Sequence, residues 1–140
     1  MSKPQILIVE DEALTVSALK RELVTLGYEI AGTADNAGDA MKLAETSRPD
    51  LVLMDIHLVG PLSGIVAAVA IRGLLQVPVV FLTAHADDKT VTNAVHTGAF
   101  GYVIKPYTTT GLKAAIETAI HKHRTELDNR GLTTAIALTA

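Results

Sequence analysis

The stretch of sequence that decides the fold is ILIVEDE, residues 6–12. Its first four residues are apolar without interruption, which predicts a strand buried on both faces of a sheet. Three carboxylates, Glu10, Asp11 and Glu12, follow directly. Two unit charges about 4 Å apart repel by roughly 4 kcal/mol at an effective dielectric constant near 20. A buried strand that ends in such a cluster therefore requires compensation from another part of the chain or from a cation.

Composition limits the classes of protein to consider. The chain has 140 residues, 49% of them hydrophobic, which is enough for one domain with a sizeable core. There are no cysteines, so disulfides and thiolate metal sites are excluded. The formal net charge is −3 and no basic patch is visible, so direct nucleic-acid binding has no electrostatic support. No apolar run is long enough to span a membrane, and residues 1–5 lack the apolar region of a signal peptide. We expect a soluble cytoplasmic protein without a membrane partner.

Strand-like and helix-like segments alternate outward from the first strand. The expected strands are Gln5–Glu10, Tyr28–Thr33 (an edge strand), Leu51–Met54, Val77–Leu82 and Phe100–Ile104. The expected helices are Ala13–Leu26, a second helix capped by Asn36, Gly64–Leu75, Asp87–His96 and a last one defined by Leu112, Ala115, Ile116, Ala119 and Ile120. This alternation predicts the α/β class, with a doubly wound five-stranded parallel sheet and helices on both faces.

Polar residues stand where four of these strands end. Glu10 and Asp11 follow the first strand, Asp55 the third, Thr83 the fourth and Lys105 the fifth. Each has an ordinary structural explanation when taken singly, as a helix-dipole partner, a turn residue, a strand residue or a surface lysine. All five nevertheless lie at the carboxyl edge of the sheet, where doubly wound folds place their sites.

The chemistry of this set follows from its charges. Clustered carboxylate oxygens are the ligands that Mg²⁺ prefers. A carboxylate beside Mg²⁺ can attack a phosphorus atom and become an acyl phosphate, whose new oxygens then need cations and donors. Asp55 is the expected nucleophile, because it ends a central strand between the metal-binding acids and Lys105.

The stretches ILIVEDE, DLVLMDIHLVG, PVVFLTA and GYVIKPY together resemble the receiver domain of two-component response regulators. The order and spacing of these motifs fit over about residues 4–124. The resemblance implies the flavodoxin-like strand order 2-1-3-4-5. It also implies a receiver domain over residues 1–124, followed at 125–140 by a tail or the start of a linker helix to an output domain.

The resemblance assigns the phosphoacceptor and the metal ligands. It implies that Asp55 accepts the phosphoryl group and that Glu10, Asp11, Asp55 and the backbone carbonyl of His57 hold Mg²⁺. The first acid is glutamate where aspartate is the commonest residue, so its longer side chain is expected to alter the metal geometry.

The resemblance assigns the remaining roles to residues of the fourth and fifth strands. Thr83 and Lys105 would contact the phosphoryl group, and Tyr102 would be the switch aromatic that turns inward with Thr83. The Lys105–Pro106 peptide would be cis.

The implied function is a phosphorylation-dependent signalling switch that assists its own phosphorylation and dephosphorylation without being a metabolic enzyme. A sensor histidine kinase or a phosphotransfer protein would supply the phosphoryl group. The face built from the fourth helix, fifth strand and last helix would then change its affinity for a downstream protein or a covalently linked output domain. A homodimer is left open.

Two further features lie outside the strand ends. In Gly64–Leu75, Ile65, Ala68, Ile71 and Leu75 are expected to face the core, yet the opposite face holds Val66, Val69, Ala70 and Leu74. This pattern predicts either an exposed apolar interface for a partner or second copy, or a helix sunk between its neighbours. His57 and His85 flank the site, and the simpler interpretation is that both are solvated. The alternative is that their titration makes the lifetime of the phosphoryl group pH-dependent.

Three other classes of protein fit parts of the sequence. A haloacid-dehalogenase-like phosphatase would use the acids, but it would want a second acid where His57 stands and a cap domain. A flavodoxin-like nucleotide-binding module would want a phosphate-cradling loop after the first strand, where the acids would repel phosphate. A pseudo-receiver would bind partners without phosphorylation, although the acids, Thr83 and Lys105 are all present.

Overall fold

The computed structural model describes residues 3–56, 58, 64–84 and 101–139, with side chains up to residue 128. The predicted helix Asp87–His96 and the site residues His57 and His85 lie outside the described residues.

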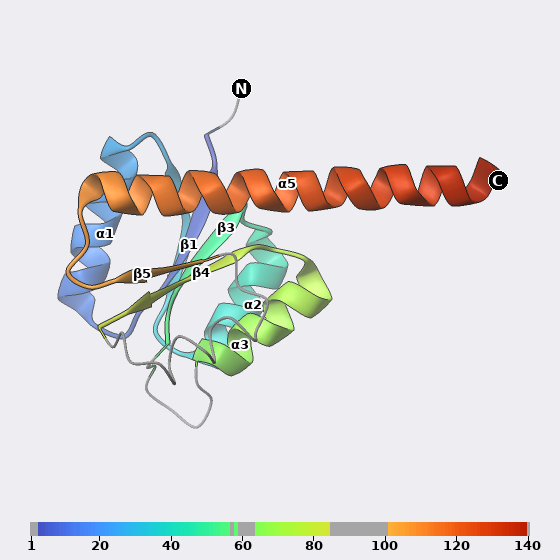
Figure 1. The fold of residues 1–140 in the computed structure, drawn as a ribbon. Coiled ribbons are helices and arrows are strands. Elements are labelled where there is room, and N and C mark those ends of the chain that lie inside the picture. The colour runs from blue at the N-terminus through green and yellow to red at the C-terminus, as the bar shows by residue number, and fades with distance from the viewer. Residues whose placement is uncertain (1–2, 57, 59–63, 85–100, 140) are drawn as a thin grey trace.

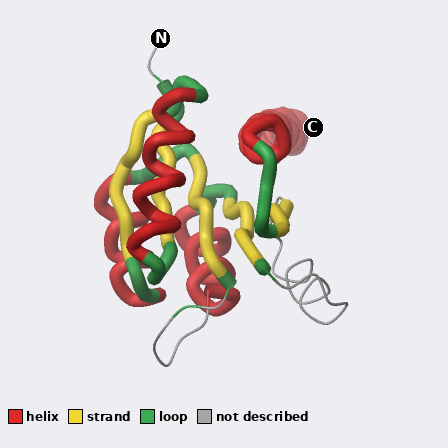
Figure 2. The backbone as a smooth tube through the Cα atoms, turned by 90° about the vertical axis from the view of Figure 1, so that its left-hand side faces the viewer, coloured by secondary structure: helices red, strands yellow, loops and turns green. Residues whose placement is uncertain are grey.

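The sheet has five parallel strands in the order β2-β1-β3-β4-β5, the order that the resemblance implies. The strands are β1 (Gln5–Val9), β2 (Glu29–Ala34), β3 (Leu51–Asp55), β4 (Val79–Thr83) and β5 (Gly101–Ile104). β2 lies at an edge, as predicted, and β1, β3 and β4 form the interior. Helices cover both faces of this sheet, as Figures 1 and 2 show.

The side chains of β1 alternate between two hydrophobic cores. Leu7 and Val9 pack on the face covered by α2 (Ala37–Ser47) and α3 (Gly64–Ala70). Ile6 and Ile8 pack on the other face, against α1 (Ala13–Thr25) and α5 (Thr109–Thr139). All four are fully buried. An uninterrupted apolar strand is thus explained by a sheet with two buried faces.

Local sequence signals mark the start of one helix and the end of another where the sequence predicts them. Asn36 caps α2, because its Oδ1 accepts from the backbone N–H of Asp39 at 2.9 Å. Gly27, with φ of 98°, follows α1 in the left-handed region that favours glycine. The predicted helix Gly64–Leu75 is not α-helical throughout: it continues from α3 as a π-helical segment, η1 (Ile71–Leu75).

The last helix is longer than its apolar spacing predicted. It begins at Thr109 and continues to Thr139, 31 residues in all. Figure 1 shows its second half running beyond the sheet, and Figure 2 shows the helix nearly end-on. The domain boundary expected at residue 124 therefore falls inside one continuous helix. Among the described helices, α5 included, none combines the length and apolar character of a membrane span.

Polar contacts fix α5 to the domain at two levels. The buried Tyr28 donates its hydroxyl to Glu117 Oε1 at 2.5 Å. Burial, and then Glu117 as acceptor and neighbouring charge, raises the pKa of the Tyr28 phenol well above its usual value. Further along, Arg72 of η1 lies 3.7 Å from Glu126.

Gly64 sets how closely α3 approaches the end of β3. Its N–H donates to the carbonyl of Ile56 at 3.1 Å. A Cβ atom at this position would lie 2.1 Å from the carbonyl oxygen of Asp55. Only glycine therefore fits here without moving the backbone that carries Asp55.

Gly64→Ala is expected to destabilise the domain by about 1–3 kcal/mol, because α3 and the Asp55 backbone must move apart. Urea denaturation followed by circular dichroism measures the change. Gly73→Ala is the matched control: nothing lies within 4 Å of a Cβ at Gly73, so alanine there should be neutral or stabilising. Equal stabilities of the two variants would contradict the close approach of α3 to β3.

Candidate functional site

The carboxyl ends of the strands bring the predicted residues to one edge of the sheet. Asp55 is the last residue of β3 and Thr83 the last of β4, and both are buried. Glu10 directly follows β1, and its N–H donates to the carbonyl of Ala34 at 2.9 Å. Lys105 directly follows β5, and its N–H donates to the carbonyl of Thr83 at 2.7 Å. Each site residue is thus placed by sheet hydrogen bonding next to it.

Lys105 lies between the two buried carboxylates. Its Nζ is 3.2 Å from Glu10 Oε2 and 3.6 Å from Asp55 Oδ2. The side chain of Glu10 is fully buried, and that of Asp55 is 10% exposed. The direct contact with Glu10 was not predicted, since the sequence analysis placed Lys105 only near the phosphoryl group. No local sequence signal links residues 95 positions apart.

Two carboxylates share one ammonium group, so their charges are only partly compensated. Burial raises the pKa of Glu10 from 4.5 to about 7, and the adjacent Asp55 carboxylate adds to this rise. Lys105 acts in the opposite direction, through its hydrogen bond and its charge. Without a further cation, a proton bound to Glu10 lowers the negative charge of the site up to near neutral pH.

The same residues form a fitting place for a divalent metal ion. Glu10, Asp11 and Asp55 each offer a carboxylate oxygen, and these oxygens lie within 4.8 Å of one another. Glu10 Oε1 is buried and, within the described part of the chain, has no hydrogen-bond partner. A buried acceptor of this kind is costly unless a donor or cation reaches it. The donor set consists of carboxylates alone, which suits a hard cation such as Mg²⁺.

The structure describes most of the other predicted positions. Tyr102 of β5 pairs with Phe81 in register and is 41% exposed. The Lys105–Pro106 peptide bond is cis. Glu12 is the N-cap of α1 and makes no side-chain cap hydrogen bond, so it stands apart from the three metal-site acids. His57 and its carbonyl lie outside the described residues.

The apolar stripe on α3 and η1 faces solvent over much of its length. Val66, Val69 and Leu74 are 48%, 52% and 83% exposed, whereas Ala70 is half-buried. Of the residues expected to face the core, Ala68 and Ile71 are buried. Ile65 and Leu75 are only half-buried, because Gly64 and Ala67 take the most buried positions instead. The helix is therefore not sunk between its neighbours.

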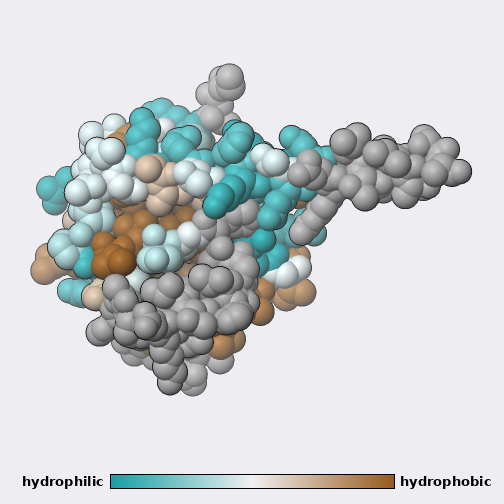
Figure 3. All heavy atoms as spheres, in the orientation of Figure 1, coloured by the Kyte–Doolittle hydropathy of each residue, from teal (hydrophilic) through white to brown (hydrophobic). Residues whose placement is uncertain are grey.

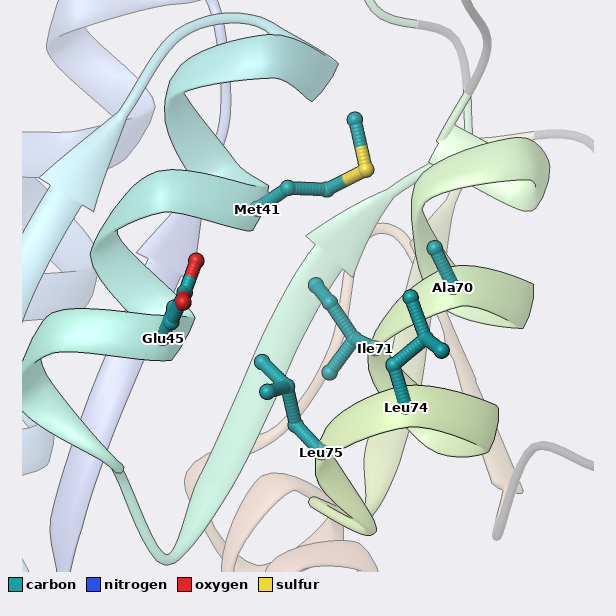
Figure 4. Close-up of a pocket in the computed structure, with 6 residues that line it drawn as sticks. All are labelled: Met41, Glu45, Ala70, Ile71, Leu74 and Leu75. Carbon is teal, nitrogen blue, oxygen red and sulfur yellow. The ribbon is translucent and has the colours of Figure 1, made fainter.

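Beside this stripe lies a small apolar cleft of about 190 Å³ between α2 and the α3–η1 helix. Figure 4 shows Met41 and Glu45 on the α2 side, facing residues of α3 and η1 across the cleft. The lining residues are Met41, Glu45, Ala70, Ile71, Leu74 and Leu75. In Figure 3 brown, apolar residues are visible where η1 reaches the surface. The arrangement is that of a shallow surface cleft.

Comparison with known proteins identifies the class of this fold and site. The family model of the response regulator receiver domain matches residues 6–117. The transcriptional regulatory protein PdtaR of Mycobacterium tuberculosis is 40% identical over 120 residues, which cover 86% of this chain and 58% of that protein. The transcriptional regulatory protein AfsQ1 of Streptomyces coelicolor is 34% identical, over 88% of this chain and 54% of that protein.

A solved structure agrees with this identification. The signal receiver domain of a modulated diguanylate cyclase from Desulfovibrio desulfuricans G20 has 38% identity and a TM-score of 0.83, covering 89% of this chain and 99% of that chain. The chain therefore belongs to the response regulator receiver domain family. It spans only a little over half the length of the curated relatives named above. Membership in this family excludes the haloacid-dehalogenase-like phosphatase and the flavodoxin-like nucleotide-binding module as alternatives.

Glu10→Gln is expected to remove a pH dependence of stability. Because the folded protein holds a proton on Glu10 that the unfolded chain has released, wild-type stability should fall as pH rises from about 4.5 to 7. The expected loss is on the order of 1–3 kcal/mol. Glutamine cannot titrate, so the variant should lack this loss. Urea unfolding at pH 5 and pH 7.5, in buffer with a metal chelator, measures both proteins.

The control for this experiment is Glu45→Gln, which makes the same exchange at an exposed residue of α2. It should keep the pH dependence of the wild type. Identical pH profiles for wild type and Glu10→Gln would contradict the raised pKa of Glu10.

Proposed function

We propose that this receiver domain is a phosphorylation-dependent switch in which Asp55 accepts a phosphoryl group from a sensor histidine kinase or a phosphotransfer protein. The observation that carries the proposal is the position of Lys105 Nζ, 3.6 Å from Asp55 Oδ2 and 3.2 Å from Glu10 Oε2, at the carboxyl edge of the sheet. Membership in the receiver family supports it. A cytoplasmic location belongs to the same proposal.

In the proposed transfer, a carboxylate oxygen of Asp55 attacks the phosphorus of a phosphohistidine. The new O–P bond gives an acyl phosphate, while the P–N bond breaks and its electron pair stays on the imidazole, which takes up a proton from solvent. Lys105 supplies a positive charge next to the oxygens that arrive at Asp55. The buried Thr83, at the end of the neighbouring strand, is proposed to donate its hydroxyl to the same group.

Mg²⁺ is the proposed cofactor, held by Glu10, Asp11 and Asp55 and by the carbonyl of His57. When bound, it supplies positive charge that reduces the repulsion between the carboxylates and the phosphoryl oxygens. The orphaned, buried Glu10 Oε1 supports this assignment. The domain assists its own phosphorylation and hydrolysis and is not proposed to be a metabolic enzyme.

The proposed output runs through Thr83 and Tyr102. Movement of Thr83 toward the phosphoryl group would make room for the half-exposed Tyr102 ring to turn inward. The face that includes β5 and α5 would then change its affinity for a partner. Ile104 of β5 is also 41% exposed, and Figure 3 shows brown, apolar residues at this side. The fourth helix expected in this face lies outside the described residues.

The partners of the whole protein are also proposals. The curated relatives named above are called transcriptional regulatory proteins, and this chain covers 58% and 54% of their lengths. A covalently linked output domain after α5, or a separate downstream protein, is therefore proposed to receive the signal. Direct nucleic-acid binding by the receiver domain itself is not part of the proposal, because the chain carries a net charge of −3.

Asp55→Asn should abolish phosphorylation, because the amide oxygen is a poor nucleophile. After incubation with acetyl phosphate and Mg²⁺, the wild type should gain the mass of one phosphoryl group and the variant none. Asp128→Asn, at an exposed position of α5, is the matched control and should behave as wild type. A wild-type protein that neither gains mass nor changes its NMR spectrum with BeF₃⁻ would favour a pseudo-receiver instead.

The apolar stripe of Val66, Val69, Ala70 and Leu74 is proposed to contact a protein partner or a second copy. Val69→Lys places a charge that such a contact would have to desolvate, so it should weaken self-association or slow phosphoryl uptake from a histidine kinase. Sedimentation velocity and the transfer rate measure these two outcomes. Val24→Lys makes the same change at another exposed valine, on α1, as a control for self-association. If Val69→Lys alters neither quantity, the stripe is not an interface.

A further inference from the structure

The chain segment that follows Lys105 is attached to α1 at a point far from the reacting groups. Glu22, on the last turns of α1, accepts a hydrogen bond from Thr109 Oγ1 at 2.6 Å. The same carboxylate lies close enough to the phenol of Tyr107 for its negative charge to raise the pKa of that group. One carboxylate thus binds Thr109, the first residue of α5, and lies near Tyr107 in the three-residue segment between Lys105 and α5.

The surroundings of Tyr107 keep its phenol uncharged at physiological pH. Its ring is half-buried and packs against the core between the sheet, α1 and α5. Burial, followed by the charges of Glu22 and Glu10, raises the pKa of Tyr107 to about 12. The phenol therefore stays protonated, and no second negative charge forms beside Glu22.

The position of α1 connects this attachment with the acids of the site. α1 begins just after Glu10 and Asp11, and Glu22 lies near its other end. α1 is therefore a rigid link between the acids that precede it and the segment that carries Lys105. On the opposite side, the hydrogen bond from Lys105 N–H to the Thr83 carbonyl, at 2.7 Å, joins the same backbone to β4.

We infer that Glu22 is a positioning residue for phosphoryl transfer: by binding Thr109 at the start of α5, it restrains the short segment that follows Lys105 and so holds the Lys105 ammonium group near Asp55. The expected effect on phosphoryl transfer rests on the proposed function, whereas the expected effect on the backbone of Lys105 does not. Glu22 itself does not touch the reacting groups. The neighbouring Thr108 makes a different contact, because its Oγ1 accepts a hydrogen bond from Gly111 N–H at 2.9 Å.

Glu22→Ala and Glu22→Gln test the inference, with Glu45→Ala as a matched exposed glutamate on α2. The rate of phosphorylation by acetyl phosphate with Mg²⁺ should fall on the order of tenfold in Glu22→Ala, because a small displacement of a charged group is costly in a preorganised site. Glu22→Gln should recover part of the rate, since its amide oxygen still accepts hydrogen bonds. Glu45→Ala should leave the rate unchanged.

A double-mutant cycle separates positioning from general destabilisation. If Glu22 acts through Lys105, Glu22→Ala should have no further effect on the rate in a Lys105→Ala background. Additive rate losses would overturn the inference, as would a wild-type rate in Glu22→Ala. Thr109→Val, which removes the donor of the hydrogen bond to Glu22, should lower the rate in the same direction.

A second readout does not depend on phosphorylation. Amide hydrogen exchange at Lys105 should be about tenfold faster in Glu22→Ala, while amides of the central strand β3 keep their protection. Unchanged exchange at Lys105 would overturn the inference even if the protein is phosphorylated normally. If the wild type takes up no phosphoryl group but exchange at Lys105 does accelerate, the proposed function fails while the structural attachment stands.

Discussion

The structure depends on a charge imbalance buried at the carboxyl edge of the sheet. Glu10 and Asp55 offer two carboxylates to one ammonium group, that of Lys105. Burying carboxylates without full compensation is unfavourable, and the protonation of Glu10 is one relief available to the protein alone. A bound cation is another, and it leaves the carboxylates ionised. The site is thus poised to accept positive charge, which is the condition that phosphoryl chemistry on an aspartate requires.

The rest of the fold serves to keep these charges in place. β1, β3, β4 and β5 are adjacent, so residues that follow them meet although they come from positions 10 to 105. The alternation of β1 between two cores fixes its register, because a slip by one residue would exchange the two faces. Gly64 allows α3 to press against the backbone of Asp55 from one side. Glu22 restrains the segment after Lys105 from the other.

The sequence was informative where a local pattern has only one structural meaning. Uninterrupted apolar strands indicated a parallel sheet, and the strand ends then predicted that Glu10, Asp11, Asp55, Thr83 and Lys105 lie at one edge of it. It was less informative about which of these groups touch. The Glu10–Lys105 contact and the Glu22–Thr109 hydrogen bond join residues 95 and 87 positions apart, and a polar side chain does not announce its partner. Helix geometry was also missed locally, because an apolar spacing that fits an α-helix does not reveal the π-helical turns at Ile71–Leu75.

The continuity of α5 has a mechanical consequence. At 1.5 Å per residue, its 31 residues form a rod about 45 Å long. Tyr28 at Glu117 and Arg72 at Glu126 act as two supports along it, and the rod overhangs the second support by about 20 Å. A tilt of about 10° at the supports would therefore carry the tip of the helix through about 3 Å. The helix is a lever, and a change in packing too small to alter the fold becomes a displacement large enough for another protein surface to register.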